Sequence, residues 1–392
     1  MFEQVLSDVK VLDLTQHISG PYCTKLMASL GAEVIKIEKP GEGDISRKLG
    51  PFLHDEPHPE KSGLFLYLNT DKKSITLNLK TQIGVRILKD LVREVDVLVE
   101  SFEPTVMPSL GLDYDTLEKI NPRLVMTSVS NFGQTGPYRD YKASEITLFS
   151  MSGLMYVLGQ EDHEPLKFGG SPGQYMAGIA AFSSTMVALH YVERTGIGQH
   201  VDLSIMECLS SSHFQQLVEY QYTGVIQNRV GAMMIFPCKD GFVAFAAQQR
   251  QWPRLAAVLG MPELLEDPRF STMESRRMHA DELAAYILPW MIERSKEEIY
   301  HAGQAAGLPV DYIATAEDLL KSPQYKDWGF FVDIEHPAAG RLTYPGTPFR
   351  MGNLNRRQDR APLLGEHNEE ILCCHLGYTK DDLVRLRASG II

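Results

Sequence analysis

The beginning of the chain alternates short β-branched runs with helical stretches, and this alternation limits the possible folds more than any other feature. The runs at 9–14 and 33–38 flank a helical stretch that follows Gly20-Pro21 and ends at Gly31. The pattern continues with strands expected at 74–79, 95–99 and 124–129 and a helix near 83–92. Strands that alternate with helices predict an α/β fold with a mostly parallel sheet covered on both faces.

The pattern changes near residue 224. A strand expected at 242–246 follows the turn 239–241, and helical stretches continue to residue 298. We therefore predict a large domain formed by 1–223 and 329–392, with a smaller domain, 224–328, inserted into it. The chain has 392 residues, of which 44% are hydrophobic, so it can bury cores for both domains. The tail is rich in Pro and Gly and precedes an amphipathic helix expected near 369–372.

The net charge of -12 disfavours nucleic acid or an anionic membrane as a partner. An anionic ligand must therefore find a local basic pocket. The five cysteines are too few and too irregularly spaced for a disulfide framework or a zinc site, which predicts a reducing compartment. No export signal is visible at the N-terminus, so we expect a cytoplasmic location.

Two further features have ordinary explanations. The most apolar helical stretch, 175–189, is shorter than the roughly 20 residues that span a bilayer, and we expect a core helix. His54 and His58 lie in a proline-broken loop without a third ligand at suitable spacing. We expect a solvated loop there and no bound metal.

Nine segments match one known family in its own order along the chain. They lie at 11–44, 68–81, 97–104, 111–125, 133–138, 194–208, 236–245, 336–349 and 361–372, and include VLDLTQHISGPYC, LNTDKKSITLNL, VLVESFEP and APLLGEHNEEIL. Nine matches in this order are very hard to obtain by chance. On these segments the chain resembles the class III CoA-transferase family, also known as the formyl-CoA transferase or CaiB-BaiF family.

The resemblance implies a fold and an activity. It implies a Rossmann-like large domain built from both ends of the chain, a small middle domain, and an interlocked dimer of ring-shaped subunits. The activity it implies moves CoA between a thioester donor, such as succinyl-CoA, and a carboxylic acid. Coenzyme A or acyl-CoA is then a substrate, and the other partners are carboxylic acids and a second subunit.

The resemblance also implies where CoA binds. Its phosphates require localised cations and free backbone N–H groups. The residues that match the family's CoA-contacting positions are Lys39, Asn69, Lys72, Lys73, Ser74 and Lys142. The alternative is that these lysines are solvated surface residues, as most lysines are. Two departures weaken the match, because the family commonly has asparagine at Ser101 and an arginine at Pro108 or Ser109.

The family's nucleophile is an aspartate that forms a mixed anhydride with the acyl group. The resemblance places it four residues before the glycine of Ala177-Gly178, at Gln174. A carboxamide has no ionised oxygen and cannot pass an acyl group onward as an anhydride. The segment 165–178 contains no Asp or Glu, and the nearest upstream acids lie in the polar loop 161–164.

Two other features near this position could carry chemistry. Glu145 falls where the family has an acid beside its pocket, although it could equally be a first-turn helix carboxylate behind Ser144. The stretch 169–173 fits the G-x-S-x-G elbow of serine hydrolases. Pro172, however, lacks the N–H that an oxyanion hole would need. We interpret this stretch as a glycine-rich loop over the thioester.

Four hypotheses follow. The first is a CoA-transferase subunit that lacks the aspartate and works with a homologous aspartate-bearing subunit, as in a benzylsuccinate CoA-transferase-like complex. The second is a homodimeric enzyme that uses Glu145. The third is an acyl-CoA racemase or isomerase, which would need an acid and a base flanking the α-carbon. The fourth is an acyl-CoA-binding protein without catalysis.

Overall fold

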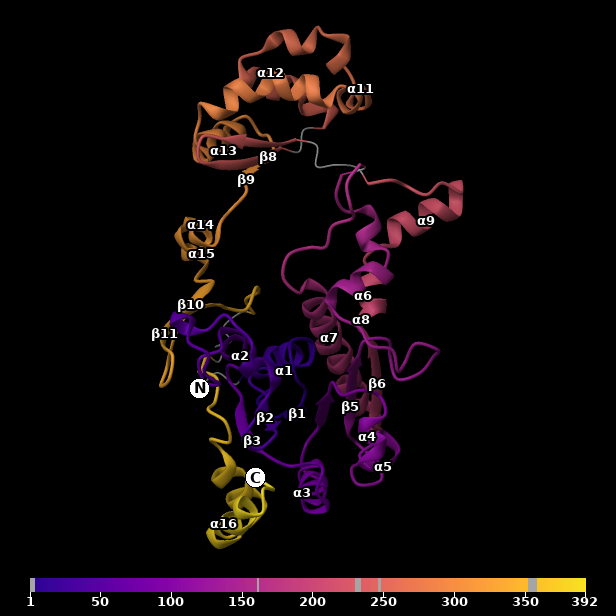
Figure 1. Cartoon of the computed structure of the whole chain (residues 1–392), viewed down its shortest axis with the longest axis vertical. Coiled ribbons are helices and arrows are strands. Elements are labelled where there is room, and N and C mark those ends of the chain that lie inside the picture. Colours follow the sequence, from indigo (N-terminus) through magenta and orange to yellow (C-terminus); the bar gives the residue numbers. More distant parts are fainter. Residues whose placement is uncertain (1–3, 161, 230–233, 246–247, 352–357) are drawn as a thin grey trace. The chain divides into compact units, whose positions relative to one another are not determined.

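The computed structural model describes residues 4–160, 162–229, 234–245, 248–351 and 358–392, which form two compact units (Figure 1). Unit 1 takes its residues from Met1–Tyr156, Lys167–Gln227 and Gly329–Ile392. Unit 2 consists of Val157–Leu166 and Asn228–Trp328. The sequence-based division did not include the short segment Val157–Leu166 in the smaller domain.

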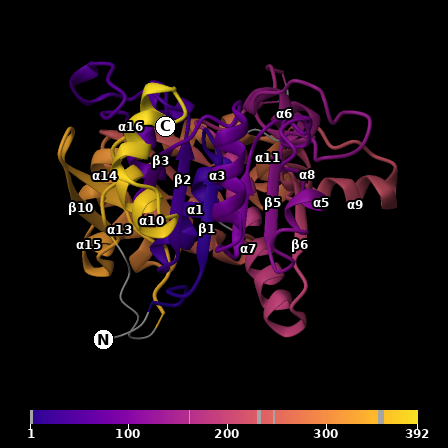
Figure 2. The same cartoon turned by 90° about the horizontal axis from the view of Figure 1, so that it is seen from below.

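Unit 1 is built on a six-stranded sheet in the order β3-β2-β1-β4-β5-β6. Figure 2 labels β3, β2, β1, β5 and β6 of this sheet. All neighbouring strands are parallel. The strands are β1 (Lys10–Leu14), β2 (Glu33–Glu38), β3 (Lys73–Thr76), β4 (Val97–Glu100), β5 (Val125–Ser130) and β6 (Gln199–Ser204). This is the strand order of the Rossmann fold, so the α/β prediction is confirmed. The strand order reverses between β1 and β4.

Helices cover both faces of the sheet because alternate residues of each strand point to opposite sides. Val11 and Val97 belong to a core shared with α1 (Ser19–Ser29) and α7 (Pro172–Thr195). Leu12 and Leu98 face the opposite core, which includes α3 (Gln82–Val92) and α16 (Lys380–Ala388). The end of the chain therefore packs on a sheet formed by the first half.

The close packing of α1 on α7 depends on Gly178. A Cβ at this position would lie 2.7 Å from the carbonyl oxygen of Ser19. Such a contact is too short for any side chain, so only glycine permits this approach.

The other elements of unit 1 surround this centre. They are α2 (Gly63–Leu68), α4 (Val106–Ser109), α5 (Tyr114–Leu117), α6 (Glu145–Met151), α8 (Ile205–Ser211), α9 (Phe214–Thr223) and the antiparallel pair β10 (Phe331–His336) and β11 (Gly340–Pro345). Short helical turns lie at Ile45–Lys48, Leu53–Asp55, Leu154–Val157 and Glu370–His375.

Unit 2 has its own apolar core, which includes Trp252, Ile287 and Ile299. Its three-stranded antiparallel sheet consists of β7 (Ile235–Cys238), β8 (Gly241–Phe245) and β9 (Val310–Tyr312). Its helices are α10 (Trp252–Leu259), α11 (Met273–Met278), α12 (Ala280–Ile292), α13 (Lys296–Ala305), α14 (Ala316–Lys321) and α15 (Pro323–Trp328), with short turns at Gln249–Gln251, Pro262–Leu265 and Pro268–Phe270. The strand predicted at 242–246 corresponds to β8, and Ala246 lies outside the described residues.

Two predicted helices differ from the structure in their bounds or type. The helix expected near 369–372 is a π-helical turn, Glu370–His375, and the regular helix is α16 further on. The helix expected at 175–189 is α7, which runs for 24 residues. Within the described residues, α7 alone is long and apolar enough to cross a membrane. Ala177, Ala181 and Val192 nevertheless pack in the core of unit 1.

Candidate functional site

A cavity of about 550 Å³ lies where the strand order of unit 1 reverses. Its lining includes Gln16 and His17 after β1, residues 101–105 after β4, and Asn131 after β5. Ligands of open α/β sheets bind at this place, outside the carboxyl ends of the strands on either side of the reversal. We call it the switch-point cavity.

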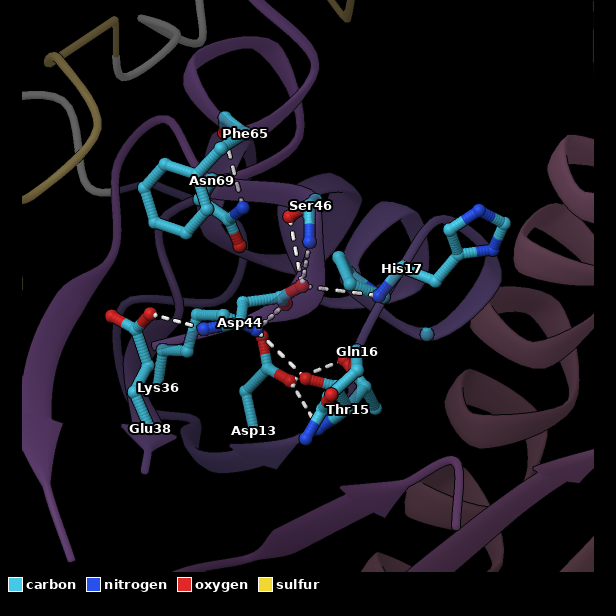
Figure 3. A network of polar contacts seen from close by, with 12 residues as sticks. Asp13, Thr15, Gln16, His17, Lys36, Glu38, Asp44, Ser46, Phe65 and Asn69 are labelled. Carbon is cyan, nitrogen blue, oxygen red and sulfur yellow. Dashed lines mark hydrogen bonds and ion pairs between the residues drawn. The ribbon is translucent and has the colours of Figure 1, made fainter. Parts of the chain in front are cut away.

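A buried ionic network fixes the loop that follows β1 (Figure 3). Asp13 Oδ2 lies 2.9 Å from Lys72 Nζ, and Lys36 Nζ lies 2.8 Å from Asp44 Oδ2. Asp44 Oδ1 in turn accepts a hydrogen bond from the backbone N of His17 at 3.2 Å. Burial by itself would raise the pKa of Asp13, but the charges of Lys36 and Lys72 outweigh it and hold the pKa far below its ordinary value.

Lys72, a predicted CoA-binding residue, has its ammonium group inside this network. Its Nζ donates to Asp13 Oδ2 at 2.9 Å, to the carbonyl of Pro21 at 2.9 Å and to Asn69 Oδ1 at 2.8 Å. Burial lowers the pKa of Lys72 to about 8. All three N–H bonds are engaged, so the structure places Lys72 as a brace between α1, β1 and the turn before β3.

The neighbouring predicted residues are also held by the protein. Asn69 is buried and donates to the carbonyl of Phe65 at 3.0 Å. The hydroxyl of Ser74 is buried and donates to Glu38 Oε1 at 2.7 Å. The side chain of Lys73 is half-buried, and its Nζ lies 2.6 Å from Glu33 Oε1 and 2.8 Å from Glu370 Oε1.

The two remaining predicted cations are exposed. The side chain of Lys39 is 52% exposed and pairs with Glu42. The side chain of Lys142 is 78% exposed, pairs with Glu103 and lines the switch-point cavity. Among the six predicted CoA-contacting residues, Lys142 is therefore the one that the structure places at this cavity. A role in CoA binding stays a prediction for all six.

Gln174 and Glu145, the two predicted catalytic positions, come together at the cavity. Gln174 lies in the first turn of α7, is 7% exposed and contributes to the lining. Glu145 begins α6 and also lines the cavity, and its Oε1 accepts a hydrogen bond from the backbone N of Gly173 at 2.8 Å. Glu145 Oε2 is buried without a hydrogen-bond partner. The nucleophile position and the nearby acid therefore share one wall.

The serine-hydrolase interpretation of 169–173 finds no support in the local structure. Residues 164–168, which lead into this stretch, do not form a strand. A Cβ added to Gly169 or Gly170 would meet no atom within 4 Å, so the glycine loop has open space beside it.

His17 also lines the switch-point cavity and was not predicted as a site residue. Its backbone is left-handed, with φ 72°, which is uncommon for a residue other than glycine. Burial lowers the pKa of His17, while the charges of Asp44 and Glu145 act to raise it. Figure 3 shows its ring pointing away from the ionic network. Its place directly after the first strand was the signal that could have identified it.

The described part of the chain contains no group of three or more His, Cys, Asp or Glu side chains that could hold a metal ion. In the loop with the two histidines, His58 Nδ1 accepts a hydrogen bond from the backbone N of Glu60 at 3.1 Å.

Comparisons with known proteins identify the family. A family model described as CoA-transferase family III matches residues 6–368. A succinyl-CoA–D-citramalate CoA-transferase of Chloroflexus aurantiacus is 36% identical over 99% of this chain and 98% of its own length. A succinyl-CoA:glutarate CoA-transferase of Mus musculus is 31% identical over 99% of this chain and 90% of its own length. The crystal structure of a CAIB/BAIF family protein from Brucella suis has 29% identity and a TM-score of 0.85, covering 94% of this chain and 98% of that one. The chain belongs to CoA-transferase family III and is an enzyme of that family.

Proposed function

We propose that this chain is the acyl-CoA-binding subunit of a CoA-transferase whose nucleophilic aspartate is supplied by a homologous second subunit. The observation that carries the proposal is Gln174 on the wall of the switch-point cavity, where the resemblance implies an aspartate. Transfer requires a carboxylate that attacks the thioester carbonyl, releases CoA as thiolate and is held as an anhydride. The carboxamide of Gln174 cannot do this.

The other acids of the cavity each have a polar partner, although Glu145 has one through Oε1 alone. Glu103 pairs with Lys142, Asp140 pairs with Arg139, and Glu145 accepts the hydrogen bond from Gly173. A carboxylate tied to a cation or an amide is a weaker nucleophile than a free one. This arrangement supports a nucleophile from outside the chain.

The acid that exchanges CoA is proposed to be a dicarboxylic acid, with succinyl-CoA as donor. The relatives named above act on succinyl-CoA with citramalate or glutarate. The cavity combines apolar lining with the cations Arg139 and Lys142. Such a lining suits an acyl chain with a second carboxylate at its far end.

The interlocked dimer and a cytoplasmic location are part of the same proposal. Several apolar side chains of unit 1 are exposed along α7 and α9, including Val187, Tyr191 and Tyr222. An apolar surface of this kind is typical of a protein–protein interface. We expect sedimentation velocity to show a stable dimer, and a monomer at moderate dilution would contradict this part.

The experiment compares the chain alone with the chain co-expressed with an aspartate-bearing homologue. The chain alone should transfer no CoA from succinyl-CoA to glutarate or citramalate. It should also show no hydroxylamine-sensitive adduct. The co-expressed pair should transfer CoA, and the adduct should map to the partner.

One observation favours a second candidate, a homodimer that uses Glu145. Glu145 Oε2 has no hydrogen-bond partner and lies on the same wall as Gln174. Turnover by the chain alone, abolished by Glu145→Gln but unchanged by Gln174→Ala, would establish this candidate and refute the paired-subunit proposal.

A further inference from the structure

Two carboxylates lie at the ends of the central strands, on either side of the reversal in strand order. Asp13 belongs to β1 and Glu100 ends β4, where the register pairs Leu14 with Glu100. Asp13 has two lysine partners, Lys36 and Lys72. Glu100 is 2% exposed, and no lysine or arginine of the described residues forms an ion pair with it. The two carboxylates therefore experience opposite surroundings.

The partners of Glu100 are neutral groups. Its Oε2 accepts a hydrogen bond from the backbone N of Phe102 at 2.8 Å. The Ser128 hydroxyl, on β5 at matching register, also hydrogen-bonds to the carboxylate. Ser128 Oγ lies 3.0 Å from His200 Nε2. The His200 ring stacks on the Tyr114 ring, with 5.3 Å between the ring centroids. This chain of contacts fixes the carboxylate from the side of β5 and β6.

The bond to Phe102 reaches the cavity. Residues 101–105 follow Glu100 directly and line the switch-point cavity, whereas Glu100 itself does not. Ser101 Oγ accepts a hydrogen bond from the backbone N of Gln16 at 2.9 Å, which ties this wall to the loop after β1. Two hydrogen bonds therefore hold this wall. One joins Gln16 to Ser101, and the other joins Phe102 to the buried carboxylate of Glu100.

We propose that Glu100 is a positioning residue for acyl-CoA binding: through the amide of Phe102 it holds the wall 101–105 in its binding conformation. The inference rests on the assignment of acyl-CoA to the switch-point cavity. It does not depend on which group is the nucleophile.

The ionisation of Glu100 controls the strength of this anchor. Burial raises the pKa of Glu100 to about 7, and the negative charge of Asp202 makes a smaller contribution in the same direction. The hydrogen bonds from Ser128 and Phe102 act to lower this pKa. Asp202 Oδ1 itself accepts a hydrogen bond from the backbone N of Gln134 at 2.9 Å. Burial lowers the pKa of His200, which therefore adds no positive charge at neutral pH.

An ionised carboxylate is a stronger acceptor than a neutral carboxyl group. The bond to Phe102 therefore strengthens as the pH rises through about 7, and the cavity wall becomes better ordered.

The test is CoA affinity by calorimetry between pH 6 and 8.5. The wild-type chain should bind CoA about three- to tenfold more tightly above pH 7 than below it. Glu100→Gln keeps the shape and an acceptor oxygen but cannot ionise, so its affinity should be independent of pH across this midpoint. Glu94→Gln, at an exposed glutamate, is the matched control and should behave as the wild type.

Two further measurements separate positioning from a merely structural role. The amide resonance of Phe102 should titrate with a midpoint near pH 7 in the wild type and not in Glu100→Gln. Ser128→Ala removes a hydrogen bond that lowers the pKa of Glu100, so it should move this midpoint to higher pH. An amide that does not titrate, or equal pH profiles for wild type and Glu100→Gln, would overturn the inference. Failure of the wild type to bind CoA at any pH would instead refute the assignment of the cavity.

Discussion

Glu145 Oε1 accepts a hydrogen bond from the backbone N of Gly173 at 2.8 Å, which connects the start of α6 to the start of α7. The next residue is Gln174, so the acid beside the pocket holds the helix turn that carries the nucleophile position. A carboxylate at a helix N-terminus is favourable in any protein, because the N–H groups there are unsatisfied. Here the same contact also anchors the backbone directly before Gln174.

Gln174→Asp should convert the chain into an acyl acceptor. The first turn of α7 favours an anion, and the residue lies on the cavity wall. Incubation of the purified variant with succinyl-CoA should give a hydroxylamine-sensitive adduct visible by intact mass. Gln174→Asn has the shape of the variant without its charge and should give none. An adduct on the asparagine variant would show that another residue reacts.

Lys39→Glu and Lys142→Glu should each weaken CoA binding about tenfold, since charge-assisted contacts to phosphate are roughly twice as strong as neutral ones. The loss should shrink at high salt because both side chains are exposed. Lys380→Glu, also at an exposed lysine, is the matched control. Calorimetric affinities equal to the control would remove both lysines from the CoA site. Lys72 is not suitable for this test because its ammonium group is buried.

Asp13→Asn should lower the free energy of unfolding by about 3 kcal/mol, because it leaves Lys36 and Lys72 buried with less compensating charge. The depressed pKa of Asp13 means that its contribution is present above the unfolded value near 3.8 and is lost as the pH falls further. Urea unfolding of the wild type and of Asp13→Asn should therefore give free energies of unfolding that differ at pH 7, and this difference should become smaller at low pH. Asp8→Asn, at an exposed aspartate, should have little effect.

Ionisation of Glu100 should have the opposite effect from ionisation of Asp13, because it should lower the free energy of unfolding. Its pKa is raised from 4.5 to about 7 in the folded chain, so the fold binds this proton more tightly than the unfolded chain does. The resulting stability is present below pH 4.5 and is lost as the pH rises through 7, by up to about 3 kcal/mol. Glu100→Gln should accordingly be more stable than the wild type at pH 8 and similar to it near pH 4.5. A difference in the free energy of unfolding between the wild type and Glu100→Gln that is the same at both pH values would contradict this.

Gly178→Ala should destabilise unit 1 by about 1–2 kcal/mol. Alanine would normally gain up to about 1 kcal/mol over glycine within a helix. At this position the added methyl group would instead lie 2.7 Å from the Ser19 carbonyl and force α1 away from α7. Gly169→Ala, which meets no atom within 4 Å, should be nearly neutral in the same urea titration.

The sheet could be predicted well because its signal is local. The run 33–38 predicts β2 with the bounds that the structure shows, Glu33–Glu38. The helix α7 extends beyond the predicted stretch 175–189 at both ends, and Ser183, Ser184 and Thr185, which lie inside that stretch, do not interrupt it. Each hydroxyl instead donates to the carbonyl four residues earlier, at 2.9, 2.8 and 2.7 Å respectively, and the helix continues.

The site could be predicted only in part. Gln174 and Glu145 were located through the resemblance, and the structure brings them to one wall. The burial of Lys72 could not be predicted, because it depends on Asp13, which lies 59 residues earlier in the chain. The raised pKa of Glu100 has the same origin, since it comes from burial that only the folded chain reveals.

The packing of residues 370–392 on the first half of the sheet has a consequence for synthesis on the ribosome. Ile371, Leu383 and Ile391 cover the same core as Ile75 and Leu88. These residues emerge only after all of unit 2 has been translated, roughly 10 to 30 s after β6 at typical elongation rates. During that interval one apolar face of the nascent sheet lacks its cover. Chaperone dependence should therefore concentrate in this interval, and ribosome-associated chaperones should be found on nascent chains that have passed β6.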